Sequence, residues 1–373
     1  MVATLHSPDQ HRLAQIDRMR RTVITERRSA ASLLADGSSE RGWIERSWRR
    51  CLDAGRQPEQ RLTFDVVPAQ ARRRAEEGNH GLLKAAKPLL DQLGRAIANS
   101  HYFAILTDAQ GMVIDVNGPV DNGDRRARQL ARVGVDLSER AVGTTAIGAV
   151  LAELVPVWLH RGEHFFDDTA VFSCAGAPLF GPDGRCVGML DLTGIEVPER
   201  PELKHLVAQW ARGIENAMAL AQPHALLLRL NWPGCSVGDD GDGLVALDGD
   251  GMVVAVNTTA RQMVAQLARG VLPTQSTHCS ELFAMPWELL FDAARRDRPV
   301  EVPLWSGLVL QVLAQSHGTT VASHPAGSER PLPLRDVETA LIRRAVDEAH
   351  GNVQEAAKAL GISRATVYRK LRR

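Results

Sequence analysis

The chain has 373 residues, of which 44% are hydrophobic, and its 44 basic residues balance its 44 acidic ones. This length predicts about two to four domains, and the ordinary apolar fraction excludes a chain that is disordered throughout. The five cysteines are scattered without a CxxC pair, and no apolar run reaches the roughly 18 residues of a membrane span. The N-terminus shows no signal-peptide pattern, so the sequence predicts a cytoplasmic protein with reduced thiols and no membrane partner.

Residues 1–80 form the first predicted region, which is helical and rich in arginine. The stretch "RGWIERSWRRCLDAG" places Trp43, Trp48 and Cys51 at helical spacing, and Gly55 offers a stop. Acidic residues are interleaved with the arginines. We therefore interpret the arginines as a solvated helix face rather than a nucleic-acid surface.

Residues 81–222 carry a different pattern, in which helices frame a set of short strands. After a helical stretch, "YFAILTDAQGMVIDVNG" consists of two apolar runs around the hairpin signal "TDAQG". Further strands follow in "LVPVWLHRGEHFF" and "AVFSCAGAPLFGPDGRCVGMLDLTG", and "PELKHLVAQWARGIENAMALA" closes the region as a helix. Antiparallel strands between helices predict an α+β domain similar to known sensor domains.

Part of this hairpin recurs later in the chain. "TDAQGMVIDVN" (Thr107–Asn117) is similar to "LDGDGMVVAVN" (Leu247–Asn257), with Asp, Gly, Met, Val, Val and Asn at the same offsets. The repeat predicts a second, smaller domain of related architecture at residues 236–315. Residues 316–331, rich in Ser, Thr, Gly and Pro, predict a linker.

The last region, residues 332–373, is basic, with ten Lys/Arg against five Asp/Glu from Arg330 onward. Its end, "GNVQEAAKALGISRATVYRKLRR", predicts a short helix, a tight turn at Gly361 and a second helix that Ser363 can cap. Apolar residues face inward with Ile362 while cations face outward. This pattern is typical of a helix-turn-helix, whose second helix enters a DNA major groove. The alternative is a helical hairpin that packs on its own protein.

Side chains on the outer face of that second helix are the candidates for DNA contacts. Arg364 can reach guanine O6 and N7, and Thr366 can reach a thymine methyl group or a phosphate. The cations nearer the end suit phosphates, which give affinity without sequence information. The predicted DNA-binding residues are Ser363, Arg364, Ala365, Thr366, Arg369, Lys370 and Arg372.

The same C-terminal stretch resembles the Fis-type helix-turn-helix that ends many bacterial enhancer-binding activators. The pieces "IERSWRRC", "LSERAVGTTAIGAVLAELVPVWLHRGEHFF", "SCAGAPLFGPDGRCVGMLDLTG" and "GDGLVALDGDGMVVAVNTTARQMV" resemble the acetoin-catabolism-activator branch of those regulators. One departure is "GTT" at Gly143–Thr145, where that branch has GTN. The resemblance covers nearly all of the chain. It implies a GAF domain at 81–222, a PAS-like domain at 236–315 and a Fis-type DNA-binding domain at 332–373.

A second departure concerns the mechanism. Most activators of this kind carry a central AAA+ ATPase that remodels polymerase bearing sigma-54. Such an ATPase needs a glycine loop of the form GxxxxGK[ST] to cradle phosphates. No Gly-Lys pair occurs in these 373 residues, and the predicted linker lies where the ATPase would be. The sequence therefore predicts regulation without ATP hydrolysis.

A ligand pocket is predicted beside the loop "AVGTTAIG" in the region that resembles a GAF domain. An apolar cavity with a few polar groups is the usual form of a small-molecule site. The candidate ligand-binding residues are Thr144, Trp158, His160, His164, Phe165, Phe172 and Cys174. Taken singly, each of these residues fits an ordinary place in the core or on the surface as well as it fits a ligand contact. No cofactor is predicted, and the effector is not identified by the sequence.

Two patterns in the sequence allow a catalytic alternative. "HRGEH" (His160–His164) fits the H-x-x-E-H pattern of inverted zincins, which needs both histidines on one continuous helix. Gly162 interrupts the pattern, and a strand is predicted before it. Cys174 and Cys186 suggest a redox activity as the second alternative.

The predicted hairpin geometry argues against a disulfide between these two cysteines. If the hairpin turns about Pro182 and Asp183, Cys174 lies opposite Asp191 and Cys186 opposite Leu179. The two thiols then do not face each other, and a disulfide needs Cα atoms within about 7 Å.

The sequence thus predicts a transcription regulator that binds double-stranded DNA and senses a small molecule. Paired helix-turn-helix units read half-sites one helical turn apart, so a homodimer is expected, with RNA polymerase or an AAA+ activator as a further partner. The alternative is a sensor or adaptor that docks to an ATPase-bearing paralogue and does not bind DNA alone. A GAF-based enzyme is the remaining hypothesis.

Overall fold

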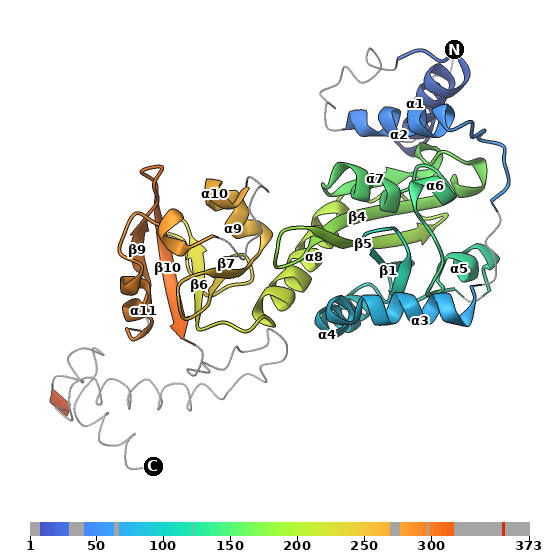
Figure 1. Cartoon of the computed structure of the whole chain (residues 1–373). Helices are drawn as coiled ribbons and strands as arrows, with labels where there is room; N and C mark the ends of the chain where they lie inside the picture. The colour runs from blue at the N-terminus through green and yellow to red at the C-terminus, as the bar shows by residue number, and fades with distance from the viewer. Residues whose placement is uncertain are drawn as a thin grey trace. The chain divides into compact units, whose positions relative to one another are not determined.

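The computed structural model describes residues 8–29, 41–62, 67–121, 123–268, 277–296, 298–316 and 353–354. The chain divides into two compact units, Met1–Gly318 and Thr319–Arg373. Two antiparallel sheets with packed helices make up the described part of the first unit (Figure 1), which confirms the predicted multidomain α+β class. The predicted linker and helix-turn-helix, residues 316–331 and 332–373, lie almost wholly outside the described residues.

The first sheet has the spatial order β2-β1-β5-β4-β3, and each neighbouring pair is antiparallel. Its strands are β1 (Tyr102–Asp108), β2 (Val113–Asn117), β3 (Val157–His160), β4 (Phe172–Phe180) and β5 (Cys186–Ile195). The helices around it are α3 (Ala69–Gly78), α4 (His80–Ala96), α5 (Arg125–Leu130), α6 (Glu139–Val142), α7 (Ala146–Glu153) and α8 (Leu203–Leu220).

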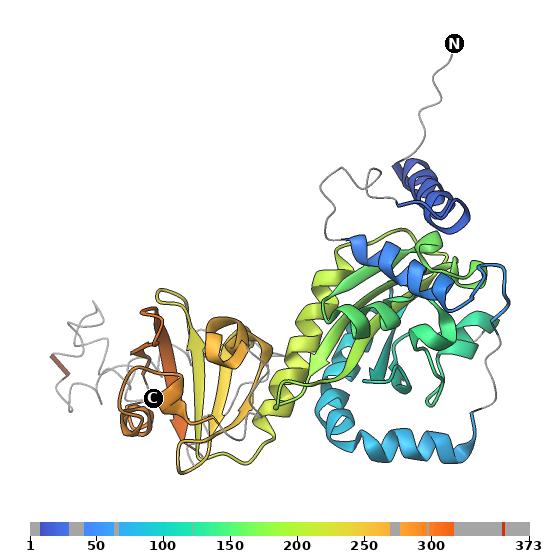
Figure 2. The same ribbon diagram turned by 45° about the horizontal axis from the view of Figure 1, so that its top comes forward.

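Helices cover both faces of the first sheet, which explains why its strands are apolar without alternation. Successive residues of β1 point to opposite faces: Phe103 and Ile105 join one hydrophobic cluster, Ala104 and Leu106 the other. Helices α4 and α8 pack on the second of these faces, and α7 packs on the first; Figure 2 shows the same elements turned by 45°.

The N-terminal helices share the core of this sheet instead of forming a separate domain. Helix α1 (Pro8–Arg20) continues into a π-helical turn (Arg21–Thr25), and α2 (Gly42–Asp53) follows. The apolar stripe of α2, including the fully buried Trp48, packs into the same cluster as Phe103 and Ile105. The apolar side of one short helix needs another apolar surface to be buried against. For α2 this surface is the face of the sheet on which α7 also packs.

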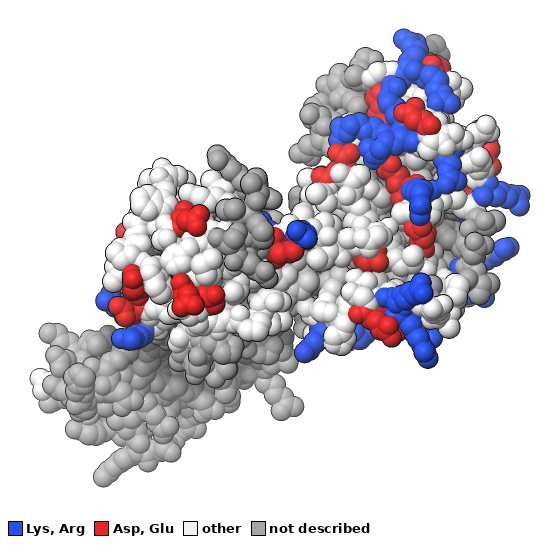
Figure 3. Space-filling view, in the orientation of Figure 1, with Lys and Arg blue, Asp and Glu red and all other residues white. Residues whose placement is uncertain are grey.

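The arginines of α2 lie at the surface and pair with carboxylates of the same domain. Arg50 donates to Glu139, and Arg46 contacts Glu153. Figure 3 shows acidic side chains interleaved with basic ones over this part of the described surface. Mutual neutralisation of this kind leaves no continuous basic patch here for a phosphate backbone.

The β4–β5 hairpin corrects one predicted register. Cys174 lies opposite Thr193, not Asp191, and Gly176 lies opposite Asp191. The turn between Gly181 and Arg185 is one residue longer than predicted and places Cys186 opposite Phe180, not Leu179. An irregularity between Leu179 and Phe180 then shifts the pairing by one more residue. All five cysteines are free thiols, so the two cysteines of this hairpin form no disulfide.

The second sheet has the order β8-β7-β6-β10-β9 and is also antiparallel throughout. Its strands are β6 (Leu226–Asn231), β7 (Gly243–Leu247), β8 (Val253–Val256), β9 (Val300–Pro303) and β10 (Val309–Ser316). Helices α9 (Thr258–Met263), α10 (Ala265–Ala268) and α11 (Glu288–Ala294) accompany it. Its central strand, β6, lies ahead of residue 236, the predicted start of this domain. We therefore propose that the domain begins before Leu226.

Candidate functional site

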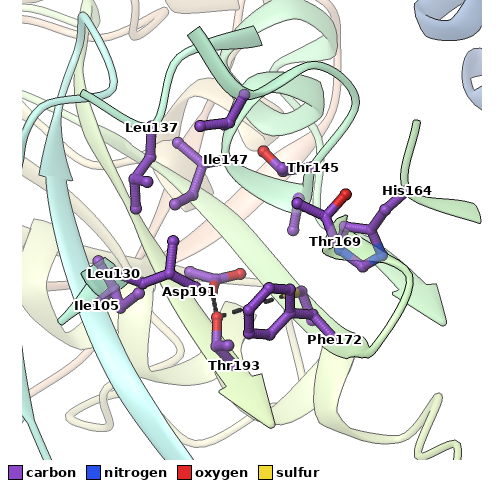
Figure 4. A pocket seen from close by; sticks show the side chains of 13 residues that line it. Ile105, Leu130, Leu137, Thr145, Ile147, His164, Thr169, Phe172, Asp191 and Thr193 are labelled. Atoms are coloured by element: carbon purple, nitrogen blue, oxygen red, sulfur yellow. Dashed lines mark hydrogen bonds between the residues drawn. The ribbon is translucent and has the colours of Figure 1, made fainter. Parts of the chain in front are cut away.

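A cavity of about 30 Å³ lies between the first sheet and the segments that join β2 to β4 (Figure 4). Its walls come from β1, β4 and β5, from α5 to α7 with their connections, and from the loop after β3. The lining residues are Ile105, Leu130, Leu137, Val142, Thr145, Ala146, Ile147, His164, Thr169, Phe172, Cys174, Asp191 and Thr193. Most of this wall is apolar, with a small number of polar groups, as in many small-molecule sites.

Strand β5 supplies the acidic group of the cavity. Asp191 and Thr193 are two residues apart on β5, so their side chains share one face of the sheet. Thr193 Oγ1 donates to Asp191 Oδ2, whereas Asp191 Oδ1 is buried and has no protein partner. Burial raises the pKa of Asp191 to about 7, so both protonation states are accessible near neutral pH.

The loop after β3 supplies a histidine. His164 is only 1% exposed, and its Nδ1 lies 2.9 Å from the carbonyl oxygen of Arg161. A carbonyl can only accept, so Nδ1 carries the proton and Nε2 presents a lone pair. Burial lowers the pKa of His164 to about 4, which keeps the ring neutral. Nε2 is buried and has no protein partner.

The other polar side chains of the cavity wall already have partners. Thr145 Oγ1 caps α7 by accepting from Gly148 N at 3.2 Å, and Thr169 Oγ1 donates to the Phe166 carbonyl at 2.8 Å. Thr193 is engaged with Asp191, as described above. Among the thirteen lining side chains, the buried nitrogen and oxygen atoms without a partner are thus His164 Nε2 and Asp191 Oδ1.

Arginines from the N-terminal region hold the loop that carries His164. We refer to Arg12, Arg20 and Arg41 as the arginine clasp. The Arg20 guanidinium donates to the carbonyls of Gly162, His164 and Phe165 and to the carboxylate of Asp167. The backbone on both sides of the cavity histidine is therefore tied to α1.

A buried glutamate anchors the rest of the arginine clasp. Glu163 is fully buried, and its carboxylate pairs with Arg12 and Arg41. It also accepts from the backbone N–H of His160 at 2.8 Å. The Arg41 guanidinium stacks over the Trp158 ring at 3.2 Å from its centroid, which adds a cation–π contact.

Three of the predicted ligand-binding residues line the cavity, and four do not. His164, Phe172 and Cys174 contribute to its wall. Thr144 is fully buried outside the cavity wall, with its hydroxyl 2.7 Å from Ser47 Oγ. His160 Nδ1 lies 2.7 Å from Ser173 Oγ, Trp158 stacks under the arginine clasp, and Phe165 packs edge-on against Phe166.

Asp191 and Thr193 are the main lining residues that sequence reasoning missed. The signal was present, because an aspartate interrupts the apolar run "CVGMLDLTG" at a position that the sheet buries on both faces. A buried carboxylate without a cation nearby is uncommon and often functional. The apolar wall residues Leu130, Leu137 and Ile147 carry no comparable signal.

The local fold at "HRGEH" differs from that of a zinc site of the H-x-x-E-H type. His160 ends strand β3, and Arg161–Glu163 form a single 3-10 turn, so no continuous helix carries both histidines. The Glu163 carboxylate is already paired with two arginines. Among the described residues, no group of three or more His, Cys, Asp or Glu is arranged to hold a metal ion.

The predicted DNA-binding residues, from Ser363 to Arg372, lie outside the described residues. The helices that the structure does describe include none with the length and apolar character needed to cross a bilayer.

Two protein families match this chain. Residues 333–373 match the Fis family of bacterial regulatory proteins, and residues 37–215 match the MimR N-terminal domain. The second match begins ahead of α2 and extends into α8, in agreement with the shared core described above.

Two curated relatives with similar sequences are named as regulators of acetoin genes. The acetoin catabolism regulatory protein of Cupriavidus necator is 29% identical over 71% of this chain and 40% of its own length. The acetoin dehydrogenase operon transcriptional activator AcoR of Bacillus subtilis is 27% identical over 47% of this chain and 29% of its own length. The chain therefore spans less than half of the length of these relatives, to which it is homologous.

Among solved structures, the complex of E. coli DhaR(N) with DhaL contains a similar chain. The similarity has a TM-score of 0.45 at 15% identity and covers 74% of this chain and 99% of the other.

Proposed function

We propose that this homologue of the acetoin catabolism regulators is a sequence-specific DNA-binding transcription regulator that senses a small molecule. The match to the Fis family over residues 333–373 supports the DNA-binding role. The homology to named regulators supports a role in transcription. The observation that carries the sensing role is the cavity of the first sheet, where His164 Nε2 and Asp191 Oδ1 are buried without protein partners.

In this proposal the first sheet and its helices form the GAF sensor domain, residues 81–222, together with α2 and the arginine clasp. The second sheet is the PAS-like domain, extended at its start to include β6. A ligand can shift a protein between two states only through a difference in its affinity for them. The loop of His164 is suited to this role, because it lines the cavity and is bonded to α1 through Arg20.

The proposed regulator works without hydrolysing ATP. The 373 residues contain no Gly-Lys pair and hence no GxxxxGK[ST] phosphate loop. Regulation then proceeds by recruiting or blocking RNA polymerase, or through a partner that carries an ATPase. We propose a cytoplasmic homodimer, because one helix-turn-helix contacts few bases and paired units give specificity. Its relatives are named as regulators, and we propose no catalytic activity.

A second candidate is a sensor or adaptor that acts with an AAA+ activator and does not bind DNA alone. The specific observation in its favour is that the chain spans 40% of the Cupriavidus regulator, while these residues lack a phosphate loop. DNA binding by the purified chain alone separates the two candidates.

The test is selection of bound sequences from a random duplex library with the full chain, at two salt concentrations. The proposal expects an enriched inverted repeat, which Arg364→Ala loses, because Arg364 is predicted from the sequence to read guanine. Arg46→Ala is the matched control, since this arginine lies on α2 and is half exposed. Its selected motif is expected to equal that of the wild type.

Salt-sensitive retention without any enriched motif would contradict sequence-specific binding, because phosphate contacts alone behave in that way. The adaptor would then be the better candidate.

A further inference from the structure

We propose that a polar joint passes structural changes from the cavity of the first sheet to the second domain. We define the polar joint as the β4–β5 turn (residues 181–185), Glu215 of α8 and Arg261 of α9. The inference rests on the proposed sensing function and describes how a change in the cavity reaches the second sheet. It is carried by the hydrogen bonds of the joint, by their burial and by the strands that run from the cavity to the turn.

The second domain holds the β4–β5 turn by its backbone. Arg261 Nη2 donates to the Gly181 carbonyl and to the Val256 carbonyl, each at 3.1 Å. The Val256 N–H donates in turn to the Pro182 carbonyl at 3.1 Å. The carbonyls of Gly181 and Pro182 therefore both accept from the second domain, so a movement of the turn breaks bonds to β8 and α9.

Glu215 bonds to both domains with one carboxylate. It is 4% exposed, and its Oε1 accepts from the Phe180 N–H at 2.9 Å, at the end of β4. Its Oε2 accepts from the Thr258 N–H at 3.3 Å, at the start of α9. The pairing of β4 with β5 is irregular between Leu179 and Phe180. Glu215 thus contacts β4 at the point where the ladder is disrupted and the strand is free to bend.

The two strands that meet in this turn also form part of the cavity wall. Phe172 and Cys174 line the cavity from β4, and Asp191 and Thr193 line it from β5. The strands stay paired from these residues up to Phe180, close to the turn. A rigid element of this kind carries displacement along its length, so a shift of the cavity wall moves the turn as well.

The polar joint retains bonding capacity that a permanently fixed contact does not have. Among the described residues, Thr258 Oγ1 and Arg261 Nε are buried and have no hydrogen-bond partner. Burial lowers the pKa of Arg261, and the charges of Glu215 and Asp183 oppose this without an ion pair to the guanidinium. Buried polar groups are ordinarily satisfied. The unmet capacity on α9 allows a second arrangement of the joint, which a switch between two states requires.

Helix α8 offers a competing route between the domains, because the chain runs from it into β6. Asn216 Oδ1 accepts from Asn257 Nδ2 at 2.8 Å, and Ala219 packs in one apolar cluster with Leu227 and Ala255. These contacts do not involve the β4–β5 turn. An experiment on the polar joint therefore has to separate it from α8.

A double-mutant cycle on the full chain makes this separation without any ligand. Asp191→Asn changes the cavity wall, and Arg261→Met removes the donors that hold the turn while keeping an apolar stem. Hydrogen exchange is measured in the wild type, the two single variants and the double variant. The segment of interest is 253–263, with β8 and α9, and residues 300–316 of the same domain control for global stability.

We expect the two substitutions to be coupled. Substitutions at distant sites without shared partners ordinarily have additive effects. The polar joint predicts that Asp191→Asn changes exchange at residues 253–263 by at least about 2-fold relative to the control segment. In the Arg261→Met background the same substitution is expected to leave this segment unchanged.

Further variants make the test independent of any single substitution. Phe172→Leu changes the cavity wall from β4 instead of β5. Gly184→Ala acts on the joint from the first domain, because a Cβ at this position would lie 1.6 Å from Arg261 Nη1 and displaces that side chain. Arg229→Met is the matched control, since Arg229 is a mostly buried arginine that pairs with Asp242 in the second domain. In this background the response to the cavity variants is expected to persist.

Each outcome decides the proposal. A response at residues 253–263 that persists in both Arg261→Met and Gly184→Ala would show that α8 carries it, which overturns the polar joint. A response to neither cavity variant, or one that Arg229→Met also removes, overturns it as well. The cycle uses neither ligand nor DNA. Its failure therefore leaves the proposed function standing, and the duplex selection can fail while the polar joint holds.

Discussion

The two sheets of this protein share a hairpin and use it differently. In both, an aspartate at the first turn position accepts from two backbone N–H groups: Asp108 from Gln110 and Met112, Asp248 from Asp250 and Met252. Both hairpins shift register at the same offset. Both then bond to a later segment, through Val113 N to the Val135 carbonyl and Val253 N to the Thr277 carbonyl, each at 2.9 Å.

The strand that pairs with the hairpin follows the hairpin in the sequence of the first domain and precedes it in the second. In the first sheet it is β5, the last strand of its domain, and in the second it is β6, the strand before the hairpin. The order of strands in space is otherwise the same. The central place in the sheet is therefore defined by packing and pairing. A strand from either end of the domain sequence can occupy it.

The buried polar groups of the two domains differ in the same way. Asn257 is fully satisfied: its Oδ1 accepts from Leu244 and Ala260, and its Nδ2 donates to Asn216 and the Asp242 carbonyl. Asp191 in the first sheet keeps one oxygen without a protein partner at the edge of a cavity. Complete satisfaction fixes structure, whereas incomplete satisfaction beside a cavity leaves bonding capacity for a ligand.

The largest effect is expected from a substitution in the apolar core beside the second sheet. Phe283 is fully buried in its helix-covered cluster. Phe283→Ala is expected to lower the free energy of unfolding by about 3–5 kcal/mol, because it removes buried area and leaves a cavity. Urea denaturation followed by tryptophan fluorescence measures this, with Phe283→Leu as the milder control. A loss below about 1 kcal/mol would mean that this core can collapse around the gap.

The next prediction concerns the pH dependence that Asp191 gives to the stability of the first domain. Its folded pKa of about 7 lies above the ordinary value of 3.8, so its contribution to stability is complete below pH 4 and is lost as pH rises to about 7. Asp191→Asn removes this loss. The variant is expected to match the wild type near pH 4 and to exceed it by at most about 4 kcal/mol above pH 7.

Neighbouring groups do not disturb this comparison. Burial lowers the pKa values of His160 and His164 to about 4, so both histidines cost stability between about pH 6.5 and 4 in wild type and variant alike. Burial raises the pKa of the Cys174 thiol well above its ordinary value, so it stays protonated. Denaturation curves from pH 4 to 8 for both proteins give the difference. A difference that does not change with pH would contradict the assignment to Asp191.

A matched pair of substitutions compares the asparagines that end the two hairpins. Asn257→Ala is expected to cost about 2–3 kcal/mol, because it leaves buried partners on three segments unsatisfied. Asn117→Ala is expected to cost less than about 1 kcal/mol, since Asn117 is half-buried and donates to the exposed Asp91 at 2.8 Å. Chemical denaturation of the two variants decides the order. Equal costs would contradict a larger structural role for Asn257 than for Asn117.

The last prediction tests the arginine clasp. Glu163→Gln is expected to cost about 1–2 kcal/mol, less than the about 3–5 kcal/mol for a fully buried pair, because Arg12 and Arg41 still reach water. Hydrogen exchange is expected to quicken in the loop of His164 and not around Asn257. Glu153→Gln, at the surface pair with Arg46, serves as the control. Faster exchange of the His164 loop in this control variant would contradict a specific role for the arginine clasp.

Local sequence patterns predicted those elements whose conformation depends on residues a few positions apart. The turns at Asp108 and Asp248, the buried stripe of α2 and the stop at Gly55 all follow from residue preferences within a few positions. The two stretches that share six residues, Thr107–Asn117 and Leu247–Asn257, both form hairpins, and the structure adds that both shift register at the same offset. These features depend on turn chemistry and helical periodicity, which the sequence states directly.

The site was decided by the tertiary structure. Ile105, His164 and Asp191 meet only because β1 pairs with β5 and the loop after β3 is tied to α1. The short apolar run of β6 carries no sign of the sheet that it joins. A longer turn and an irregularity beside Leu179 together place Cys174 opposite Thr193 instead of Asp191. Sheet pairing between distant segments follows from the packing of the whole domain. The sequence by itself thus determined the classes of element, the repeated hairpin and the Fis-type pattern of the last residues, whereas long-range pairing decided which side chains share the cavity.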